Sequence, residues 1–359
     1  MSSGVDYTRS EVSRMAGYVP GRQPSPGSRT IKLNTNESPL PPSPKVAAAI
    51  TDVLLDDSIM RRYPDPQSLE LRQVAAGISG CQSSQVIAGN GSDELLRVVL
   101  DTFVEKDEVV AFFKPSYSLY PVLSRIRGGR IKSLPLFQEG SIYQPDTDGI
   151  KLFFLTSPNA PLGFSFSKDY IRELARNLQG ILVVDEAYAD FAEENALTLV
   201  QELDNLIVLR TLSKSYGLAS LRVGLGFAAS ALIEQLDKVR DSYNLDRLAQ
   251  VGACAALADQ DYLQKTVALV VAERRRLSLA LEALGFKVEP SQTNFIFVTP
   301  PPGCDAAKLY AGLEKNGILV RYFADPDLAH GLRISIGTAA EMNQLILVIK
   351  NLLDNGDFN

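Results

Sequence analysis

The sequence predicts an α/β protein, with a mostly parallel central sheet in a large domain and a smaller α/β domain after it. Between residues 86 and 226, short apolar runs alternate with stretches of helical periodicity, the pattern of strands and helices in a parallel sheet. Polar residues follow the apolar runs, at the strand ends where parallel sheets bind ligands. We expect an arm at 1–42, a large domain at 43–247 and a small domain at 248–359.

The flanking segments have weaker but readable signals. Residues 1–30 are polar and rich in Pro and Gly, as in an arm that leads into extended chain. Ser43-Pro44 is a good helix start, and helical periodicity resumes at Leu69 after the proline-rich loop Tyr63-Pro64-Asp65-Pro66. In the last third we expect strands at 295–298, 318–322 and 332–336, and helices at 231–240, 262–284, 304–315 and 339–353.

Composition excludes several classes of function. The net charge of −6 and the pI of about 5.1 argue against nucleic acid or an anionic membrane as the main partner. The start, Met-Ser-Ser-Gly-Val-Asp, has no signal-peptide core, so we expect a cytoplasmic protein. Cys81, Cys254 and Cys304 are far apart, and His330 is the only histidine. This distribution encodes neither a disulfide framework nor a metal cluster or Ser-His-Asp triad.

A lysine near several hydroxyl groups follows one predicted buried strand. The apolar run 206–209 leads into Arg-Thr-Leu-Ser-Lys-Ser-Tyr-Gly, which places Lys214 close to Thr211 and Ser213. Arg222 comes shortly afterwards, and Gly217 lets the backbone turn closely around a ligand. This combination of an amine, hydroxyl groups and a guanidinium suits a phosphorylated ligand bonded to the lysine.

Two further predicted strand ends carry residues that suit the same kind of phosphorylated ligand. Asp185 follows the apolar run 181–184, where an aspartate can hold the protonated pyridine nitrogen of pyridoxal phosphate. The turn Gly-Asn-Gly-Ser-Asp at 89–93 lies between a predicted strand and a predicted helix, where free N–H groups and the helix dipole bind phosphate. This turn does not fit the dinucleotide pattern Gly-x-Gly-x-x-Gly, because its last position is Glu94. The looser match at 224–229 is interpreted as a strand.

Three motifs together resemble a known family. Ser-Pro-Asn at 157–159, Asp-Glu-Ala-Tyr at 185–188 and Ser-Lys-Ser-Tyr-Gly-Leu-Ala-Ser-Leu-Arg at 213–222 are similar to motifs of the fold-type I, class I/II pyridoxal-phosphate aminotransferases. Within that group the chain most resembles the histidinol-phosphate aminotransferases, over nearly its whole length. The resemblance implies pyridoxal phosphate bound in the large domain, a small-molecule amino donor with a 2-oxo acid, and a homodimer with composite active sites.

The resemblance also implies roles for individual residues. Lys214 would bind the cofactor covalently and carry the proton between substrate carbon and cofactor, and Asp185 would keep the ring nitrogen protonated. Asn159 and Tyr188 would bond the ring oxygen, and Tyr117 would cover the ring face. The cofactor phosphate would be held by Gly91, Ser92, Asp93, Thr211, Ser213, Arg222 and, from the neighbouring subunit, Tyr63.

Substrate residues follow from the same resemblance. Arg333 would take the acidic group of the substrate, because a guanidinium fork matches carboxylate and phosphate alike. The arm at 1–42 would pack with the small domain and approach the active site from that side. The other substrate residues would be Arg321, Tyr18, Asn36 and Tyr243. The chain departs from the commoner motifs at Ala160, Leu162, Ser242 and Asp246, which we expect to affect specificity rather than catalysis.

Several functions fit these residues. We expect transfer of the amino group from histidinol phosphate to 2-oxoglutarate, giving imidazole acetol phosphate and glutamate in histidine biosynthesis. An aromatic amino-acid aminotransferase would place a carboxylate on the same Arg333. A related phosphothreonine decarboxylase would use the same cofactor residues. A non-catalytic transaminase-like binding module is the fourth alternative, and the presence of both Lys214 and Asp185 argues against it.

Overall fold

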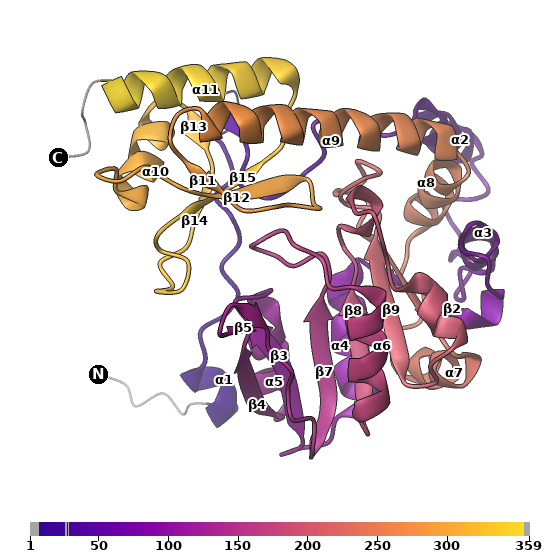
Figure 1. Ribbon diagram of the computed structural model, residues 1–359. Coiled ribbons are helices and arrows are strands. Elements are labelled where there is room, and N and C mark those ends of the chain that lie inside the picture. The colour runs from indigo at the N-terminus through magenta and orange to yellow at the C-terminus, as the bar shows by residue number, and fades with distance from the viewer. Residues whose placement is uncertain (1–6, 26, 28, 355–359) are drawn as a thin grey trace, which may run out of the picture.

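Two sheets, one of seven strands and one of four, form the frame of the molecule. The computed structural model describes residues 7–25, 27 and 29–354 (Figure 1). Residues 1–6, 26 and 28 of the predicted arm lie outside the described residues, as do 355–359. The smaller sheet lies beyond one end of the strands of the larger sheet, as Figure 1 shows. The space between the two sheets is therefore the first place to look for a site.

The larger sheet has the strand order β2-β10-β9-β8-β7-β3-β4. Its neighbouring strands are parallel except at β10, which runs antiparallel to both β2 and β9. The predicted α/β class with a mostly parallel sheet is therefore confirmed. In the register, Asp185 of β8 lies opposite Thr156 of β7 and Leu209 of β9, so β7 and β8 end at one level and β9 continues beyond them to Thr211. The strands are β2 (Val86–Asn90), β3 (Val109–Lys114), β4 (Arg130–Pro135), β7 (Ile150–Thr156), β8 (Ile181–Asp185), β9 (Leu206–Thr211) and β10 (Val223–Ala228).

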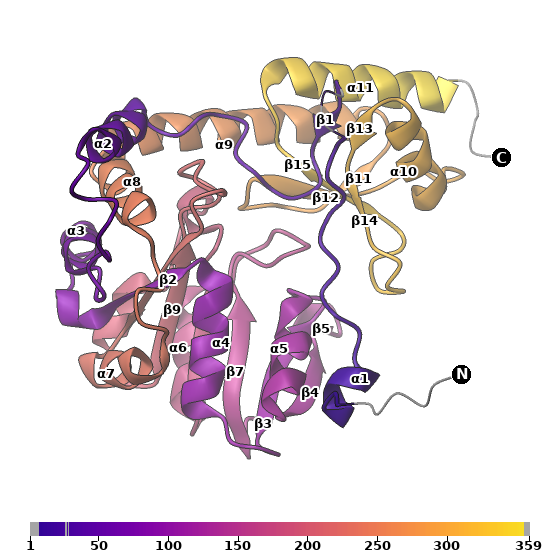
Figure 2. The same cartoon turned by 180° about the vertical axis from the view of Figure 1, so that it is seen from behind.

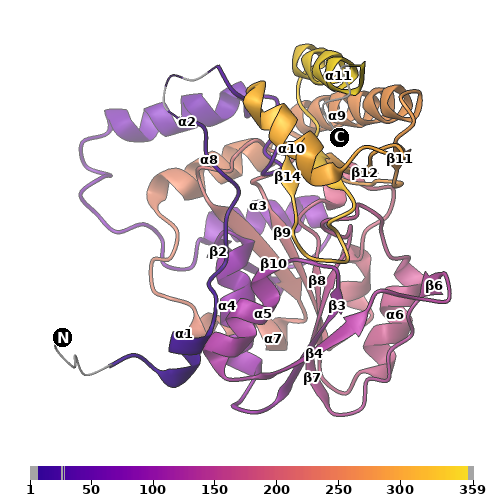
Figure 3. The same ribbon diagram turned by 90° about the vertical axis from the view of Figure 1, so that its left-hand side faces the viewer.

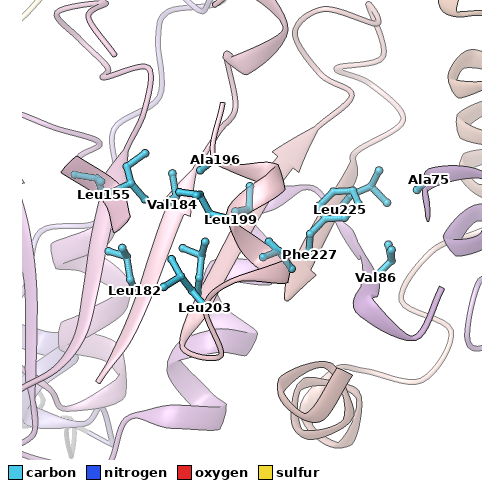
Figure 4. Packing of buried hydrophobic residues seen from close by; sticks show 14 of the residues in the cluster. Ala75, Val86, Leu155, Leu182, Val184, Ala196, Leu199, Leu203, Leu225 and Phe227 are labelled. Carbon is cyan, nitrogen blue, oxygen red and sulfur yellow. The ribbon is translucent and has the colours of Figure 1, made fainter. Parts of the chain in front are cut away.

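Helices cover both faces of the larger sheet, because its central strands are apolar on both sides. On one face α4, α5 and α7 pack over a core that contains Ile87 and Val183 (Figure 2). On the other face, Leu182, Val184 and Leu225 belong to a core that α2, α3, α6 and α8 cover (Figure 4). These helices are α2 (Pro44–Leu55), α3 (Leu69–Ser79), α4 (Ser92–Phe103), α5 (Leu119–Arg127), α6 (Lys168–Asn177), α7 (Ser230–Val239) and α8 (Arg247–Leu257).

The smaller sheet is antiparallel, with the order β11-β12-β15-β14. Its core contains Phe295, Ile334 and Leu345, and it is covered by three helices of the last third of the chain. The elements are α9 (Gln260–Glu282), β11 (Lys287–Val288), β12 (Phe295–Thr299), α10 (Ala306–Lys315), β14 (Arg321–Tyr322), β15 (Leu332–Ser335) and α11 (Ala339–Asp354).

The single strand predicted at 318–322 is wrong, because its two halves pair with different partners. The first half, β13 (Ile318–Leu319), pairs in parallel with β1 (Ile31–Lys32) near the N-terminus. The second half, β14, pairs with β15. Two separate sets of backbone hydrogen bonds therefore divide the run at Val320, whose side chain is buried in the smaller core. The pairing of β1 also ties the N-terminal segment to the smaller sheet.

The change from one core to the other falls along α9. Helix α8, which follows the predicted boundary at residue 247, contributes Ala249 and Ala253 to a core of the larger sheet. Helix α9 then contributes Val270 and Leu277 to the core of the smaller sheet. The division into segments at residues 42 and 247 stays a prediction.

The remaining described elements are short. Within the described ranges, no helix combines the length and the apolar character needed to cross a membrane. The short elements are α1 (Ser10–Arg14), η1 (Ser83–Gln85), β5 (Phe137–Gln138), β6 (Ser141–Ile142), η2 (Ala189–Phe191) and η3 (Leu197–Gln201).

Candidate active site

A cavity of about 660 Å³ lies where the strand ends of the larger sheet face the smaller sheet. The N-terminal chain that follows α1 passes beside the larger sheet toward the smaller one (Figure 3). Its residues Gly17 and Tyr18 line the cavity. Three parts of the chain that are distant in sequence therefore meet here. Of the residues singled out in the sequence, the cavity is lined by Tyr18, Asn36, Ser92, Asp93, Tyr117, Asp185, Tyr188, Thr211, Ser213, Lys214, Arg222, Arg321 and Arg333.

Lys214 reaches into this cavity from the loop after β9. Its Nζ donates to the carbonyl oxygen of Thr35 at 3.1 Å and lies 5.8 Å from the centre of the Tyr188 ring. Burial lowers the pKa of Lys214 to about 8, and the positive charge of Arg333 acts in the same direction. An amine with this pKa is partly neutral near neutral pH, so it can act as a nucleophile and as a base. The Thr35 contact was not predicted, because it joins segments that are far apart in sequence.

Asp185 lies at the end of β8 with only 3% of its surface exposed. Its carboxylate accepts from the hydroxyl of Tyr120 at 2.9 Å and from the N–H of Ala187 at 3.2 Å. Tyr120 also bonds Thr156 at 2.7 Å. Burial raises the pKa of Asp185 to about 6, although the bond from Tyr120 opposes the shift. The sequence reasoning missed Tyr120; its spacing of one helical turn from Tyr117 was the available signal.

The turn before α4 is shaped to hold an anion. Gly91 has φ +80°, and a Cβ at this position would lie 2.5 Å from Nη2 of Arg222. Helix α4 begins at Ser92, so its N–H groups and dipole favour negative charge at this end. Ser213 accepts from Thr211 at 3.0 Å and from Arg222 at 3.4 Å. A glycine turn, a helix start, two hydroxyls and a guanidinium together make a phosphate cradle.

Asp93 differs from its neighbours in this cradle, because a carboxylate repels a phosphate. In the structure the Asp93 carboxylate accepts from the Tyr117 hydroxyl at 3.1 Å and lies 3.5 Å from the Arg222 guanidinium. Tyr117 also makes an edge contact with Tyr18, with ring centres 5.9 Å apart. The Asp93 side chain therefore positions the ring of Tyr117 and the fork of Arg222.

Two arginines from the smaller sheet line the cavity on the side of the N-terminal chain. Arg333 donates to the carbonyl oxygen of Asn34 at 3.1 Å and lies over the rings of Phe295 and Phe323 at 5.2 and 5.5 Å. Its Nε is buried and, among the described residues, has no hydrogen-bond partner. Arg321 donates to the carbonyl oxygen of Val19 at 3.2 Å. An unpartnered buried N–H beside a cavity favours an anionic ligand there.

Comparison with known proteins identifies the family. The sequence model of the family "Aminotransferase class I and II" matches residues 28–349. The chain belongs to this family.

Individual relatives agree with this assignment. A histidinol-phosphate aminotransferase of Citrifermentans bemidjiense is 48% identical over 96% of this chain and 98% of its own length. One of Geobacter sulfurreducens is 47% identical over 96% of this chain and 99% of its own. The crystal structure of histidinol-phosphate aminotransferase from Sinorhizobium meliloti in complex with pyridoxal-5'-phosphate has a TM-score of 0.85 at 27% identity, covering 98% of this chain and 99% of that one.

The cofactor of this aminotransferase family is pyridoxal phosphate, and the cavity residues fit it. The cradle at Gly91 and Arg222 suits the phosphate, the buried Asp185 suits the protonated ring nitrogen, and Lys214 suits the aldehyde. When bound, the cofactor supplies an aldehyde that reacts with amines and a ring that accepts the electron pair of the substrate carbon. With the cofactor bound, Asp185 would hold the proton of the ring nitrogen, and Lys214 would move a proton at the substrate carbon.

The structure leaves four predicted site residues outside the cavity lining, namely Gly91, Asn159, Tyr63 and Tyr243. Gly91 lies against Arg222, which does line the cavity. The amide of Asn159 donates to the carbonyl oxygen of Pro115 at 3.2 Å and accepts from the N–H of Leu162 at 3.2 Å, the local bonding that Asn favours in turns.

Tyr63 and Tyr243 stack on each other at 4.5 Å on the surface, 77% and 42% exposed. The roles predicted for Asn159 at the ring oxygen, for Tyr63 at the cofactor phosphate of the neighbouring subunit and for Tyr243 at the substrate stay predictions.

We expect covalent cofactor attachment to depend on Lys214. Borohydride treatment of the holoenzyme should fix the cofactor on Lys214, and mass spectrometry of the peptide should show the added mass. Lys214→Ala should lose both the adduct and nearly all turnover. Lys114→Ala removes another lysine that lines the cavity and should keep the adduct. An adduct that survives in Lys214→Ala would falsify this assignment.

The raised pKa of Asp185 predicts that the free energy of unfolding of the cofactor-free protein depends on pH. Because the folded pKa is about 6 and the ordinary value 3.8, the folded state holds this proton more tightly, and stability is lost as pH rises through that range. Asp185→Asn removes the titrating group and therefore this loss. The free energy of unfolding of the variant, relative to that of wild type, should rise by on the order of 2–3 kcal/mol as the pH is raised from 4 to 7. Urea unfolding at several pH values measures the difference, and a difference that does not change with pH contradicts the prediction.

Proposed function

We propose that this protein transfers the amino group of histidinol phosphate to 2-oxoglutarate, giving imidazole acetol phosphate and glutamate in histidine biosynthesis. The relatives support the proposal, since two histidinol-phosphate aminotransferases share 47% and 48% of their aligned residues with this chain over nearly their whole lengths. The cytoplasmic location expected from the sequence is part of the same proposal, and cell fractionation checks it.

The observation that carries the proposal is a second anion site in the cavity. The cradle at Gly91 and Arg222 accounts for the phosphate of the cofactor. Arg333 and Arg321 come from the smaller sheet instead, and the buried Nε of Arg333 has no partner among the described residues. A second anionic group is therefore expected on the substrate. Histidinol phosphate offers a phosphate away from its amine, and 2-oxoglutarate offers a carboxylate away from its keto group.

The remaining roles in the reaction belong to Lys214 and to the aromatic residues that line the cavity. Lys214 lies at the reacting end, where its lowered pKa lets it accept and return a proton. Tyr117 is held by Asp93 and contacts Tyr18 edge-on, so two aromatic rings border the space left for an imidazole. The N-terminal chain closes the outer side of this space with Tyr18 and Val19.

Substrate preference tests the proposal directly. The value of kcat/KM should be at least tenfold higher for histidinol phosphate than for phenylalanine. A tenfold preference for phenylalanine would replace the proposed donor by an aromatic amino acid. Release of carbon dioxide without a new amino acid from the keto-acid acceptor would indicate the phosphothreonine decarboxylase.

Removal of the Arg333 guanidinium should weaken the binding of both substrates. A charge-assisted hydrogen bond contributes roughly 1.5–3 kcal/mol, so Arg333→Ala should lower kcat/KM for donor and acceptor by about ten- to a hundred-fold. The absorbance of the bound cofactor should remain. Arg333→Lys keeps the charge without the fork and should recover part of the loss. Arg275→Ala on the exposed side of α9 is the control and should leave kcat/KM unchanged. An equal effect at both positions would contradict the role of Arg333.

We also propose that the active unit is a homodimer in which Tyr63 completes the site of the partner subunit. Its support is the 77% exposure of Tyr63, stacked on Tyr243 at the surface instead of packed inside. Mixing inactive Lys214→Ala with Tyr63→Phe should produce heterodimers that contain one intact site, and activity should return. If mass spectrometry shows subunit exchange and activity stays at the level of the separate variants, the shared site is wrong.

A further inference from the structure

A chain of buried hydrogen bonds leads from the smaller sheet to the cavity. Ser335 at the end of β15 bonds the side chain of Asn36 at 2.9 Å, and Asn36 bonds the hydroxyl of Tyr188 at 2.9 Å. The exposed fractions of the three residues are 3%, 2% and 7%, so water does not compete with these bonds. Tyr188 follows β8 of the larger sheet, and both Asn36 and Tyr188 line the cavity.

The directions of these hydrogen bonds are fixed by what each group can donate. The backbone N–H of Asn36 donates to the Ser335 hydroxyl at 2.9 Å, so the Ser335 hydrogen is available for Oδ1 of Asn36. This orients the amide of Asn36 with Nδ2 toward Tyr188, where it donates. The backbone of Asn36 is held in the left-handed region, with φ 56°, and its carbonyl accepts from Asn294 at 2.9 Å.

A directed chain of this kind determines what the Tyr188 hydroxyl can do. Its oxygen already accepts from Asn36, so its own hydrogen is free to be donated toward the cavity. The amide of Asn159, the other predicted partner of the cofactor ring oxygen, donates one of its two Nδ2 hydrogens to the Pro115 carbonyl, which leaves the second for a ligand. Among the described residues, Asn159 makes no hydrogen bond to Asn36 or Tyr188, so the two predicted donors can be tested separately.

We propose that Asn36 is a positioning residue that orients the Tyr188 hydroxyl for donation to the ring oxygen of pyridoxal phosphate, with Ser335 fixing the amide of Asn36. This inference rests on the proposed use of the cofactor and is independent of the substrate. A hydrogen bond donated to the ring oxygen draws electron density from it and weakens its hold on the proton of the neighbouring lysine nitrogen. Asn36 therefore lowers the pKa of the bound chromophore without contacting the cofactor.

The test is a spectroscopic pH titration of the holoenzyme, which reads the chromophore pKa independently of turnover. One neutral hydrogen bond corresponds to roughly 0.5–1 pKa unit, so Tyr188→Phe should raise the chromophore pKa by about that amount. Asn36→Ala should raise the pKa in the same direction by a smaller amount. In Asn36→Ala/Tyr188→Phe the Asn36 effect should vanish, because it acts through the hydroxyl. The charged groups that face Tyr188, namely Lys214, Arg333, Asp185 and Asp93, stay unchanged in this series.

Two further variants keep the test decisive. Ser335→Ala should raise the chromophore pKa slightly, and it serves if Asn36→Ala does not fold. Asn159→Ala is the comparison variant: the effect of Asn36→Ala on the chromophore pKa should persist in Asn36→Ala/Asn159→Ala, and its loss there would show that Asn36 acts through Asn159 and overturn the proposal. Additive effects of Asn36→Ala and Tyr188→Phe would overturn it as well. A wild-type protein that binds no chromophore at all would instead contradict the proposed cofactor.

Discussion

The burial of Asp185 is the constraint on which the site depends. A carboxylate that is 3% exposed at the end of a central strand loses its hydration, and the hydroxyl of Tyr120 and the N–H of Ala187 replace only part of it. The hydration that is lost and not replaced raises the pKa of Asp185 to about 6. A cationic nitrogen of a ligand is therefore a favourable partner for this carboxylate. The parallel sheet makes this burial possible, because Thr156 of β7 and Leu209 of β9 flank Asp185 and shield the carboxylate on both sides.

The two cores meet at the cavity, and the N-terminal segment joins them. Strand β1 pairs with β13 beside the smaller sheet, and the chain that follows places Thr35 on Lys214 and Asn36 on Tyr188. One short stretch thus contacts both Lys214 and Tyr188, the two residues proposed to act at the reacting end of a bound cofactor. Asn36 also bonds Ser335 of β15, and the same strand carries Arg333, the proposed substrate residue.

The sequence predicts those parts of the site that local pattern encodes. Apolar runs identify buried strands, and Lys214 and Asp185 could be found because each directly follows such a run. Tyr120 and Thr35 were missed, because their bonds to Asp185 and Lys214 cross long stretches of sequence and depend on the packing of the fold. The predicted strand at 318–322 failed for a related reason, since strand pairing is decided by partners and its two halves have different ones. Family motifs led to Asn159, whose role at the ring oxygen stays a prediction; its amide also makes local bonds in its own turn.

The role proposed for Arg333 would let one cavity serve two unlike substrates. Its guanidinium is held between the rings of Phe295 and Phe323 and by a single bond to the Asn34 carbonyl, so the fork is oriented before any ligand arrives. The buried Nε is a donor whose unmet hydrogen bond costs roughly 1–3 kcal/mol, a cost that a bound anion removes. A phosphate and a carboxylate both satisfy this donor, because the guanidinium donates to a pair of oxygens, which both anions present. Discrimination against other amines must therefore come from the space between the fork and Lys214, which Tyr117 and Tyr18 border.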